Sequence, residues 1–300
     1  MAAISVRELV DAGVHFGHHA SRWNPKMSQF IHGKRNLIHI INLVETVKGL
    51  TRARHFLKEL ASTGRQIVIV GTKRQIKSTI ATEAQRAGMP YVNERWLGGT
   101  LTNFTTIRSR LKRLEELEQL ELSGDLLLYT KKEQAMVMRE LKRIKKNLDG
   151  VRVLNKLPGA LVVIDPAKEY IAVREANRLR VPIVSVLDTD CDPDLVDIPI
   201  PANDDAMRSV SLILSKLVDA IVEGRANYRE GVAAIQDDEP QIEMKRRENR
   251  GPQRRQGGPK KGGRGEGRGE GRGPSAPAAD EAPEAAAESA PAADAGETKA

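Results

Sequence analysis

The sequence contains little of several residue types, and each scarcity argues against a class of protein. A single cysteine, Cys191, excludes an internal disulfide framework and a zinc site built from cysteines. No apolar run approaches the ~20 residues that a bilayer span needs, which argues against a membrane protein. The N-terminus, MAAISVRELV, lacks a basic region followed by a long apolar stretch. We therefore expect no secretory signal peptide and a cytoplasmic location.

Apolar residues are also scarce, at 40% of the chain, and the shortage is concentrated at the C-terminus. Residues 226–300 are mostly Gly, Ala, Pro, Glu and Arg, and they hold 12 of the 25 glycines. Such a segment cannot bury enough apolar surface to offset its chain entropy. The sequence predicts a disordered tail over 226–300, Gly/Arg-rich at first and then Ala/Pro/Glu-rich. A diffuse affinity for RNA and a purely solvated role both remain open for it.

The excess of positive over negative charge lies in the first half of the chain. Residues 1–150 hold 26 Lys and Arg against 14 Asp and Glu, whereas residues 151–225 hold 9 against 12. The net charge of +8 for the whole chain therefore comes from the N-terminal half. This asymmetry indicates one basic face and a polyanionic partner, with solvated charge as the simpler alternative.

Outside the tail, short β-branched runs alternate with segments of helical period. Strands followed by helices and joined by short loops form parallel sheets with helices on both faces. The sequence predicts an α/β body of residues 1–103 and 149–225. We expect strands at 36–41, 66–71, 91–93, 160–165, 181–187 and 197–201, and helices at 42–63, 74–87, 167–179 and about 203–224.

Residues 104–148 break this alternation and predict an inserted helical hairpin. Two apolar stripes at helical spacing flank a turn signal at residues 123–125, and the remaining positions carry Lys, Arg and Glu. A one-sided stripe needs only a partner helix, so we predict an antiparallel coiled coil. The stripes consist of Ile107, Leu111, Leu114 and Leu117 in the first helix, and Val137, Leu141, Ile144 and Leu148 in the second.

Three patterns suggest a ligand site, and each is incomplete. Residues 71–74, Gly-Thr-Lys-Arg, follow a predicted buried strand, where phosphate loops occur, but neither glycine-rich nucleotide motif is present. The alternating aspartates from Asp188 to Asp194 lack the Gly and Glu of a calcium loop. His15 and His18 could hold a metal with a distant Asp188 or Asp205, against the alternative of a packed or RNA-facing loop. The sequence predicts no catalytic set, no cofactor and no metal site, and Cys191 between aspartates should be a poor thiolate.

Loops that combine aromatic and basic residues are the most distinctive remaining feature. Residues 93–104 place Trp96 beside Arg95 in a Gly/Thr/Asn-rich loop, and residues 21–27 place Trp23 between Arg22 and Lys26. Such loops suit base stacking and phosphate contact. The alternative is that both tryptophans support their loops against the body while only the charged side chains face outward.

Eight segments in register resemble the family of bacterial small-subunit ribosomal proteins called S2, over about residues 3–225. They are LVDAGVHFGH at 9–18, WNPKM at 23–27, IHIINL at 38–43, VGTKR at 70–74, RWLGGTLTN at 95–103, PGALVVID at 158–165, EAN at 175–177 and PIPANDDA at 199–206. The tail departs from the family, which ends sooner.

This resemblance implies a flavodoxin-like three-layer fold with a coiled-coil hairpin and a structural, non-enzymatic role. It also implies contact with small-subunit rRNA and with neighbouring ribosomal proteins, among them the large mRNA-binding protein of the small subunit. We expect Trp23 and Trp96 to support the loops, and the hairpin cations Lys142, Arg143, Lys145 and Lys146 to form a second surface. The predicted rRNA contacts are Arg22, Lys26, Lys34, Arg35, Lys73, Arg74, Arg95, Arg108 and Lys112.

Overall fold

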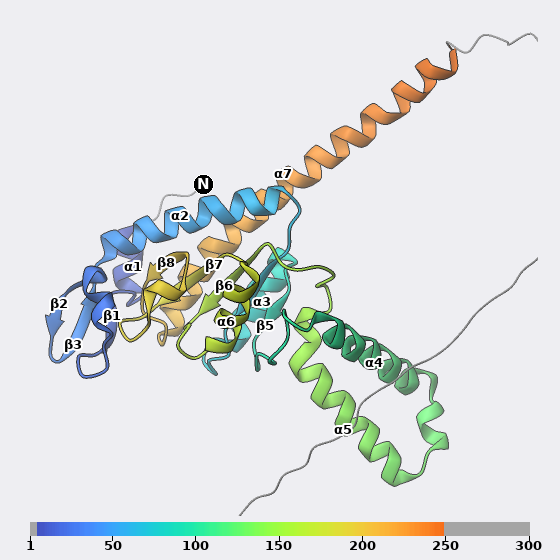
Figure 1. Cartoon of the computed structure of the whole chain (residues 1–300), viewed down its shortest axis with the longest axis horizontal. Coiled ribbons are helices and arrows are strands. Elements are labelled where there is room, and N and C mark those ends of the chain that lie inside the picture. The colour runs from blue at the N-terminus through green and yellow to red at the C-terminus, as the bar shows by residue number, and fades with distance from the viewer. Residues whose placement is uncertain (1–4, 249–300) are drawn as a thin grey trace, which may run out of the picture. The chain divides into compact units, whose positions relative to one another are not determined.

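A computed structural model of the chain describes residues 5–248. Its centre is a five-stranded parallel sheet in the order β5-β4-β6-β7-β8 (Figure 1). Numbered along the chain from one to five, these strands have the order 2-1-3-4-5, which is that of flavodoxin. The α/β prediction is therefore confirmed for the body. The strands are β4 (Ile67–Val70), β5 (Tyr91–Val92), β6 (Ala160–Ile164), β7 (Ile183–Leu187) and β8 (Ile198–Pro201).

The sheet is buried on both faces because its strands are continuous apolar runs. Ile67 and Ile69 of β4 point into one core, and Val68 and Val70 point into the other. The prolines of β8 lie in an edge strand, where a missing N–H costs no ladder hydrogen bond.

Helices cover both faces of this sheet, as predicted. Helices α2 (Leu43–Ser62), α3 (Lys77–Ala87) and α7 (Met207–Glu248) supply the first core, and the short α1 (Val6–Asp11) adds Leu9 to it. Helix α6 (Tyr170–Leu179) and the adjoining end of α4 (Phe104–Ser123) supply the second core. In Figure 1, α2 and α7 lie side by side over one face.

The predicted strand at 36–41 exists, but it does not belong to the parallel sheet. It is β3 (Ile38–Ile41), the centre of a separate antiparallel sheet with β1 (Phe16–His19) and β2 (Ile31–Arg35). A two-residue turn joins β2 to β3, and both of its residues, Asn36 and Leu37, have positive φ. That geometry is typical of a tight hairpin. The Gly- and His-rich β1 and β2 lack the apolar alternation that marks a strand, so sequence reasoning missed them.

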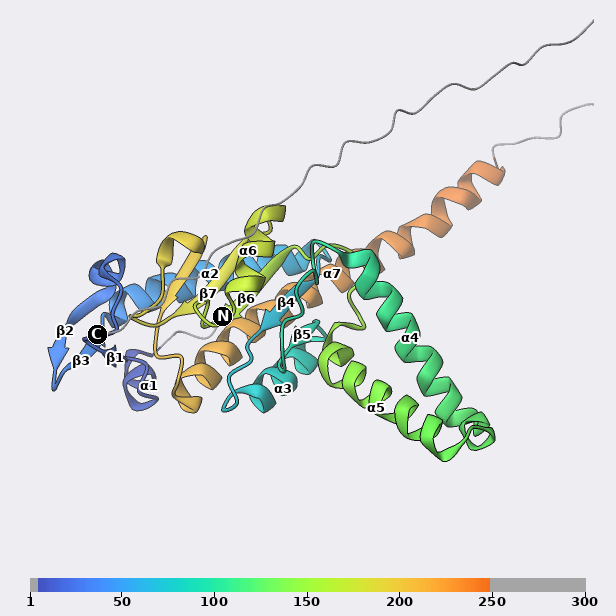
Figure 2. The ribbon, with the colours of Figure 1, turned by 60° about the horizontal axis from the view of Figure 1, so that its bottom comes forward.

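Helix α4 and helix α5 (Lys131–Leu148) occupy the range expected for the hairpin and lie next to each other (Figure 2). The stripe of α4 is buried, and Leu114 and Leu117 pack against Leu141 of α5. Gly124 ends α4 with a φ of +79°, and a capping box of Thr130 and Glu133 begins α5.

The last helix differs from its predicted end. Helix α7 continues past Gly224 to Glu248, so residues 226–248, which were predicted to begin the tail, are helical. The rest of the predicted tail, 249–300, lies outside the described residues. Four 3-10 turns complete the chain within 5–248: η1 (Pro25–Phe30), η2 (Asp125–Leu128), η3 (Asp149–Val151) and η4 (Pro193–Leu195). Across the same range, no helix has the length and apolarity to cross a bilayer.

Candidate nucleic-acid interface

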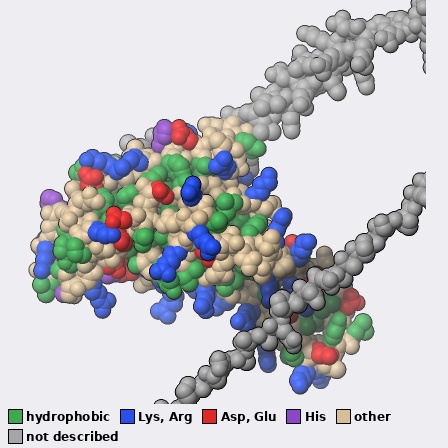
Figure 3. All heavy atoms as spheres, in the orientation of Figure 1, with side chains coloured by type: hydrophobic (Ala, Val, Ile, Leu, Met, Phe, Trp, Pro, Cys, Tyr) green, Lys and Arg blue, Asp and Glu red, His purple; other side chains and the backbone are tan. Residues whose placement is uncertain are grey.

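Eight of the nine cations predicted to contact rRNA have exposed side chains. They lie on three parts of the body: the small antiparallel sheet with the segment that joins β1 to β2, the loops that follow β4 and β5, and the first half of α4. Figure 3 shows Lys and Arg side chains gathered where the body meets the α4–α5 pair. The eight are Arg22, Lys26, Lys34, Arg35, Arg74, Arg95, Arg108 and Lys112.

Lys34 and Arg35 occupy the end of β2, the edge strand of the small sheet. They lie opposite His39 and Ile38 of β3. The tight turn that follows holds the two side chains at the tip of a hairpin. Among the described residues, neither has a carboxylate within ion-pairing distance, so both charges are available to a partner.

Lys26 is exposed but already paired. Its Nζ lies 2.8 Å from Asp192 and 2.6 Å from Asp194, carboxylates that belong to the loop around η4. Hydrogen bonds to Asp192 and Asp194 raise the pKa of Lys26 above its usual value. This pairing connects η1, which contains Lys26, to the segment after β7, and a phosphate contact at Lys26 would compete with it.

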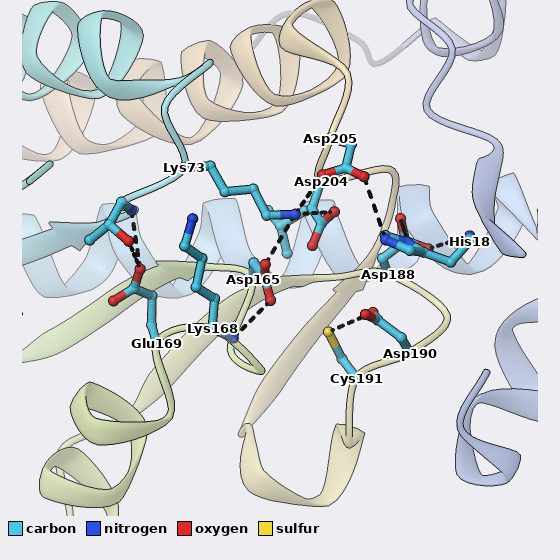
Figure 4. Close-up of polar contacts among 12 residues, drawn as sticks. His18, Lys73, Asp165, Lys168, Glu169, Asp188, Asp190, Cys191, Asp204 and Asp205 are labelled. Atoms are coloured by element: carbon cyan, nitrogen blue, oxygen red, sulfur yellow. Dashed lines mark hydrogen bonds and ion pairs between the residues drawn. The ribbon is translucent and has the colours of Figure 1, made fainter. Parts of the chain in front are cut away.

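Lys73 is the exception among the nine, because its side chain is only 11% exposed. Its Nζ lies 3.0 Å from Asp165, 2.7 Å from Asp204 and 2.8 Å from Asp205 (Figure 4). Burial opposes the charged form, but Asp204 and the other carboxylates outweigh it and raise the pKa of Lys73. The buried, fully paired ammonium weighs against the predicted phosphate contact.

The chain topology explains why these residues meet. Lys73 follows β4, Asp165 follows β6 and Asp204 follows β8, and the carboxyl ends of parallel strands lie at one edge of a sheet. Ligands of open α/β sheets bind at this edge. Here the edge holds carboxylates around one lysine, which we call the acid cluster: Lys73, Asp165, Asp188, Asp204 and Asp205. Its carboxylates would repel a phosphate, which weakens the case for a nucleotide at residues 71–74.

His18 of β1 reaches the same edge. Its Nδ1 lies 2.8 Å from Asp188 and its Nε2 lies 3.4 Å from Asp205 (Figure 4). A hydrogen bond to Asp188 is the main cause that raises the pKa of His18 to about 9. Gly17 permits this approach, because a Cβ there would lie 2.6 Å from Cγ2 of Thr189. The distant acids considered for His18 therefore do come together with it.

The donor set around His18 has the chemistry of a cation site. Ligand atoms of His18, Asp188 and Asp204 all lie within 4.8 Å of one another, and one imidazole with two carboxylates suits a divalent ion. Burial, together with the negative charge of Asp165, raises the pKa of Asp204 to about 7. His15, the other histidine considered, does not belong to this group.

Cys191 lies at the same edge and is fully buried. Burial and then the charge of Asp190 raise the pKa of its thiol. The sequence-based prediction of a poor thiolate is confirmed in direction, although burial contributes more than the neighbouring anions do.

Sequence reasoning missed Glu175 of α6 as the residue that organises the loop after β5. Its buried carboxylate accepts hydrogen bonds from the backbone N–H groups of Gly99 at 2.6 Å, Leu101 at 2.9 Å and Thr102 at 3.2 Å. It also accepts one from Nε1 of Trp96 at 3.2 Å. The signal in the sequence was an acidic residue at a predicted core position of a helix.

The two tryptophans are held differently. Trp96 is buried in the second core, under the loop that exposes Arg95. Trp23 is half-exposed, and its ring lies 5.2 Å from that of His39 in β3. Trp96 therefore anchors its loop from inside, whereas Trp23 rests on the surface of the small sheet.

Comparison with known proteins places the chain in a family. The family model described as ribosomal protein S2 matches residues 9–224. A small ribosomal subunit protein uS2 of Microcystis aeruginosa is 52% identical over 237 residues, which is 79% of this chain and 88% of the relative. A uS2c of Rhodomonas salina is 53% identical over 75% of this chain and 92% of its own length. The uS2 of Thermus thermophilus is 53% identical over 76% and 89%. The chain belongs to the ribosomal protein S2 family, a structural and non-enzymatic family of the small ribosomal subunit.

Proposed function

We propose that the chain is a structural constituent of the small ribosomal subunit that docks on rRNA through the exposed cations of its N-terminal half. The observation that carries this proposal is the family match over residues 9–224, in a chain whose excess of Lys and Arg over Asp and Glu lies in residues 1–150. We propose the cytoplasm as its place of work, together with the ribosome.

The proposed contact residues are exposed cations without a carboxylate partner in the described part of the chain. Such cations can neutralise phosphates and release counterions without first breaking an ion pair. Structured RNA is A-form, so recognition would rest on backbone, 2′-hydroxyl and loop contacts. The set consists of Arg22, Lys34, Arg35, Arg74, Arg95, Arg108 and Lys112.

Helices α4 and α5 are proposed as an antiparallel coiled-coil insertion, residues 104–148, in the body of residues 1–103 and 149–225. The packing of Leu114 and Leu117 on Leu141 supports this division. The cations Lys142 and Arg143 of α5 are exposed and would add a second rRNA surface.

Protein partners are proposed for the acidic half of the body. Residues 151–225 hold more acids than bases and would be repelled by RNA. The resemblance of the eight sequence segments to the S2 family implies neighbouring small-subunit proteins as partners, including the large mRNA-binding protein, and the acidic half is left for them or for solvent.

The test is retention on salt-washed small subunits. Replacing Lys34→Ala and Arg35→Ala together should weaken retention and flatten its dependence on salt, because two phosphate contacts are lost. The matched control is Arg174→Ala with Arg178→Ala, which removes two exposed cations from α6 in the acidic half. Equal retention of the Lys34/Arg35 variant and the wild type would remove this pair from the rRNA footprint.

Two rival functions are distinguished by thermal unfolding of the pure protein with ligands and by sedimentation of cell lysate. An enzyme that uses residues 71–74 would be stabilised thermally by ATP, NAD or a divalent ion as the pure protein. A free RNA-binding regulator would remain at the top of a sucrose gradient of lysate. A ribosomal component would travel with the small subunit.

A further inference from the structure

We propose that a cleft at the base of α4 and α5 accepts an unstacked nucleotide of single-stranded or loop RNA. The hairpin cleft, as we call it, has a volume of about 730 Å³, within the ~300–1,000 Å³ typical of small-molecule sites. The inference rests on the proposed function, because it names the form of RNA that one part of the basic surface takes. The residues that carry it are Arg95, Leu97, Arg110, Arg143, Ile144 and Lys146.

Three guanidinium groups in the hairpin cleft are free to bind an anion. Arg95, Arg110 and Arg143 are all exposed, and none has an ion-pair partner within the part of the chain that is described. They come from three elements: the loop after β5, α4 and α5. Guanidinium groups bind phosphate in a bidentate manner and stack on flat rings, so each can contact either part of a nucleotide.

The two acids in the hairpin cleft are already paired. Glu94 lies 2.6 Å from Nζ of Lys77 and 3.6 Å from Nζ of Lys146, and hydrogen bonding to Lys77 lowers its pKa. Glu140 lies 3.6 Å from Arg113. The lining therefore carries four cations against two carboxylates, and both carboxylates have cationic partners. An anion that enters meets a positive field.

The floor of the hairpin cleft is apolar. Leu97 and Ile144 are half-buried and pack on the second core, and Leu148, also in the lining, is a buried member of that core. A base that leaves its stack loses apolar contact, and such a floor restores it. Asn147 lies in the same lining and carries an amide that can hydrogen bond to the edge of a base.

This combination favours an unstacked nucleotide over the other anions that RNA and proteins present. The backbone of a duplex presents phosphates to a flat or convex basic surface, and its stacked bases cannot contact a concave apolar floor. An acidic peptide offers carboxylates but no flat ring to lie between Leu97, Ile144 and the guanidinium planes. Phosphate and base together match both halves of the lining.

The test compares two RNAs on the purified full chain. A fluorescent oligouridine presents unstacked bases, and a duplex of equal length presents phosphates alone. Arg143→Ala should weaken binding of the oligouridine by roughly tenfold and of the duplex by less than about twofold. Arg143→Lys keeps the positive charge but lacks the planar guanidinium group. Its affinity for the oligouridine should therefore lie between those of Arg143→Ala and the wild type.

The matched control is Arg139→Ala, which removes an exposed cation from the same helix outside the hairpin cleft, one that has no ion pair with any described residue. It should reduce both affinities slightly and equally. An Arg143→Ala variant that behaves like Arg139→Ala on both RNAs would overturn the inference and leave the proposed function standing. Loss of the proposed function would instead appear as failure of the wild-type chain to sediment with small subunits.

A second measurement does not depend on the variants. Photocrosslinking of assembled subunits that contain 4-thiouridine should attach an unpaired nucleotide to residues 95–97 or 143–148. Adducts that fall only outside these two segments would overturn the inference.

Discussion

Glu175 shows how a single side chain connects distant segments of this molecule. It lies on α6, and its carboxylate binds three backbone N–H groups of a loop that precedes it by more than seventy residues. The charge of the carboxylate is matched by peptide dipoles and the indole N–H, and within residues 5–248 no Lys or Arg forms an ion pair with it. The loop that exposes Arg95 is therefore held in one shape before any partner binds.

At the acid cluster, the positive charge of Lys73 permits the carboxylates of Asp165 and Asp204 to remain buried close together. Asp204 and Asp165 are both buried, and Lys73 contacts both. Removing one partner of a buried ion pair leaves an uncompensated charge, which is far more costly than losing a surface pair.

Replacing Lys73→Met should therefore lower the free energy of unfolding by about 3 kcal/mol at neutral pH. The loss should shrink as the pH falls, because the freed carboxylates then bind protons. The matched control is Arg74→Ala, an exposed neighbour, which should change the stability by less than ~0.5 kcal/mol. Urea unfolding at several pH values measures both. Equal stability of the two variants would show that Lys73 does not hold the cluster together.

Residue-level sequence reasoning identified the right residue types at this edge but not their partners. Gly-Thr-Lys-Arg after a buried strand correctly predicted a charged group at the carboxyl edge of the sheet. The sequence could not say that this group faces Asp204, because the two residues are 131 positions apart. Pairings of that kind are set by the order of strands in the sheet, which no local pattern contains.

Among the elements, α4 and α5 are joined to the body by a defined ion pair as well as by apolar contact. Arg152, which follows η3, binds both carboxylate oxygens of Glu118 in α4 at 2.7 Å. A hydrogen bond to Arg152 is the largest cause that lowers the pKa of Glu118 to about 2. Both side chains are partly exposed to solvent, which screens the interaction.

This shift predicts a specific pH dependence. The folded pKa of Glu118 lies below its usual value of 4.5, so the pair stabilises the fold above that pH and the contribution is lost as the pH falls toward 2. Glu118→Gln should cost up to about 1 kcal/mol of unfolding free energy at pH 7, and less at pH 3. Glu116→Gln, which removes a more exposed acid from the same helix, is the control. A difference between wild type and Glu118→Gln that did not vary with pH would contradict the assignment.

The predicted end of α7 was wrong for a clear physical reason. Gly224 was expected to end a helix, yet it lies inside α7 because a Cβ there would lie 2.3 Å from the carbonyl oxygen of Lys58 in α2. It is a glycine of close helix packing rather than of a helix end. The cap of α2 was predictable: the Asn42 side chain accepts a hydrogen bond from the N–H of Val44. Glu45, in the first turn of the same helix, pairs with Lys48.

For the whole molecule, the separation of charge between the two halves of the sequence survives in the fold. The carboxylates of residues 151–225 concentrate at the carboxyl edge of the sheet, where Lys73 and His18 partly neutralise them. The cations proposed to contact rRNA lie on β2 and the segment before it, on the loops after β4 and β5, and on α4 and α5. Composition alone predicted this asymmetry, since charge that cannot be buried must lie on the surface.

Binding to rRNA should therefore depend on salt through the N-terminal half alone. Replacing Arg108→Ala and Lys112→Ala together should reduce the slope of log affinity against log salt by about 1 to 2. The Arg174/Arg178 double variant should leave the slope unchanged. Filter binding of rRNA fragments over a range of salt concentrations measures the slope. A control variant that lowered it as much as the Arg108/Lys112 pair would argue against a one-sided footprint.

The hydrogen bonds that seat the small antiparallel sheet on the body join residues far apart in order of synthesis. The N–H of His18 donates to Asp188, 170 positions later, and the Asn203 amide donates to the carbonyl oxygen of Gly13, 190 positions earlier. A chain is synthesised from its N-terminus. The segment around β1 therefore cannot form these hydrogen bonds until nearly all of the body has been translated. During that interval its apolar side chains, Leu9 and Val14 among them, are exposed to chaperones and to other unfinished chains.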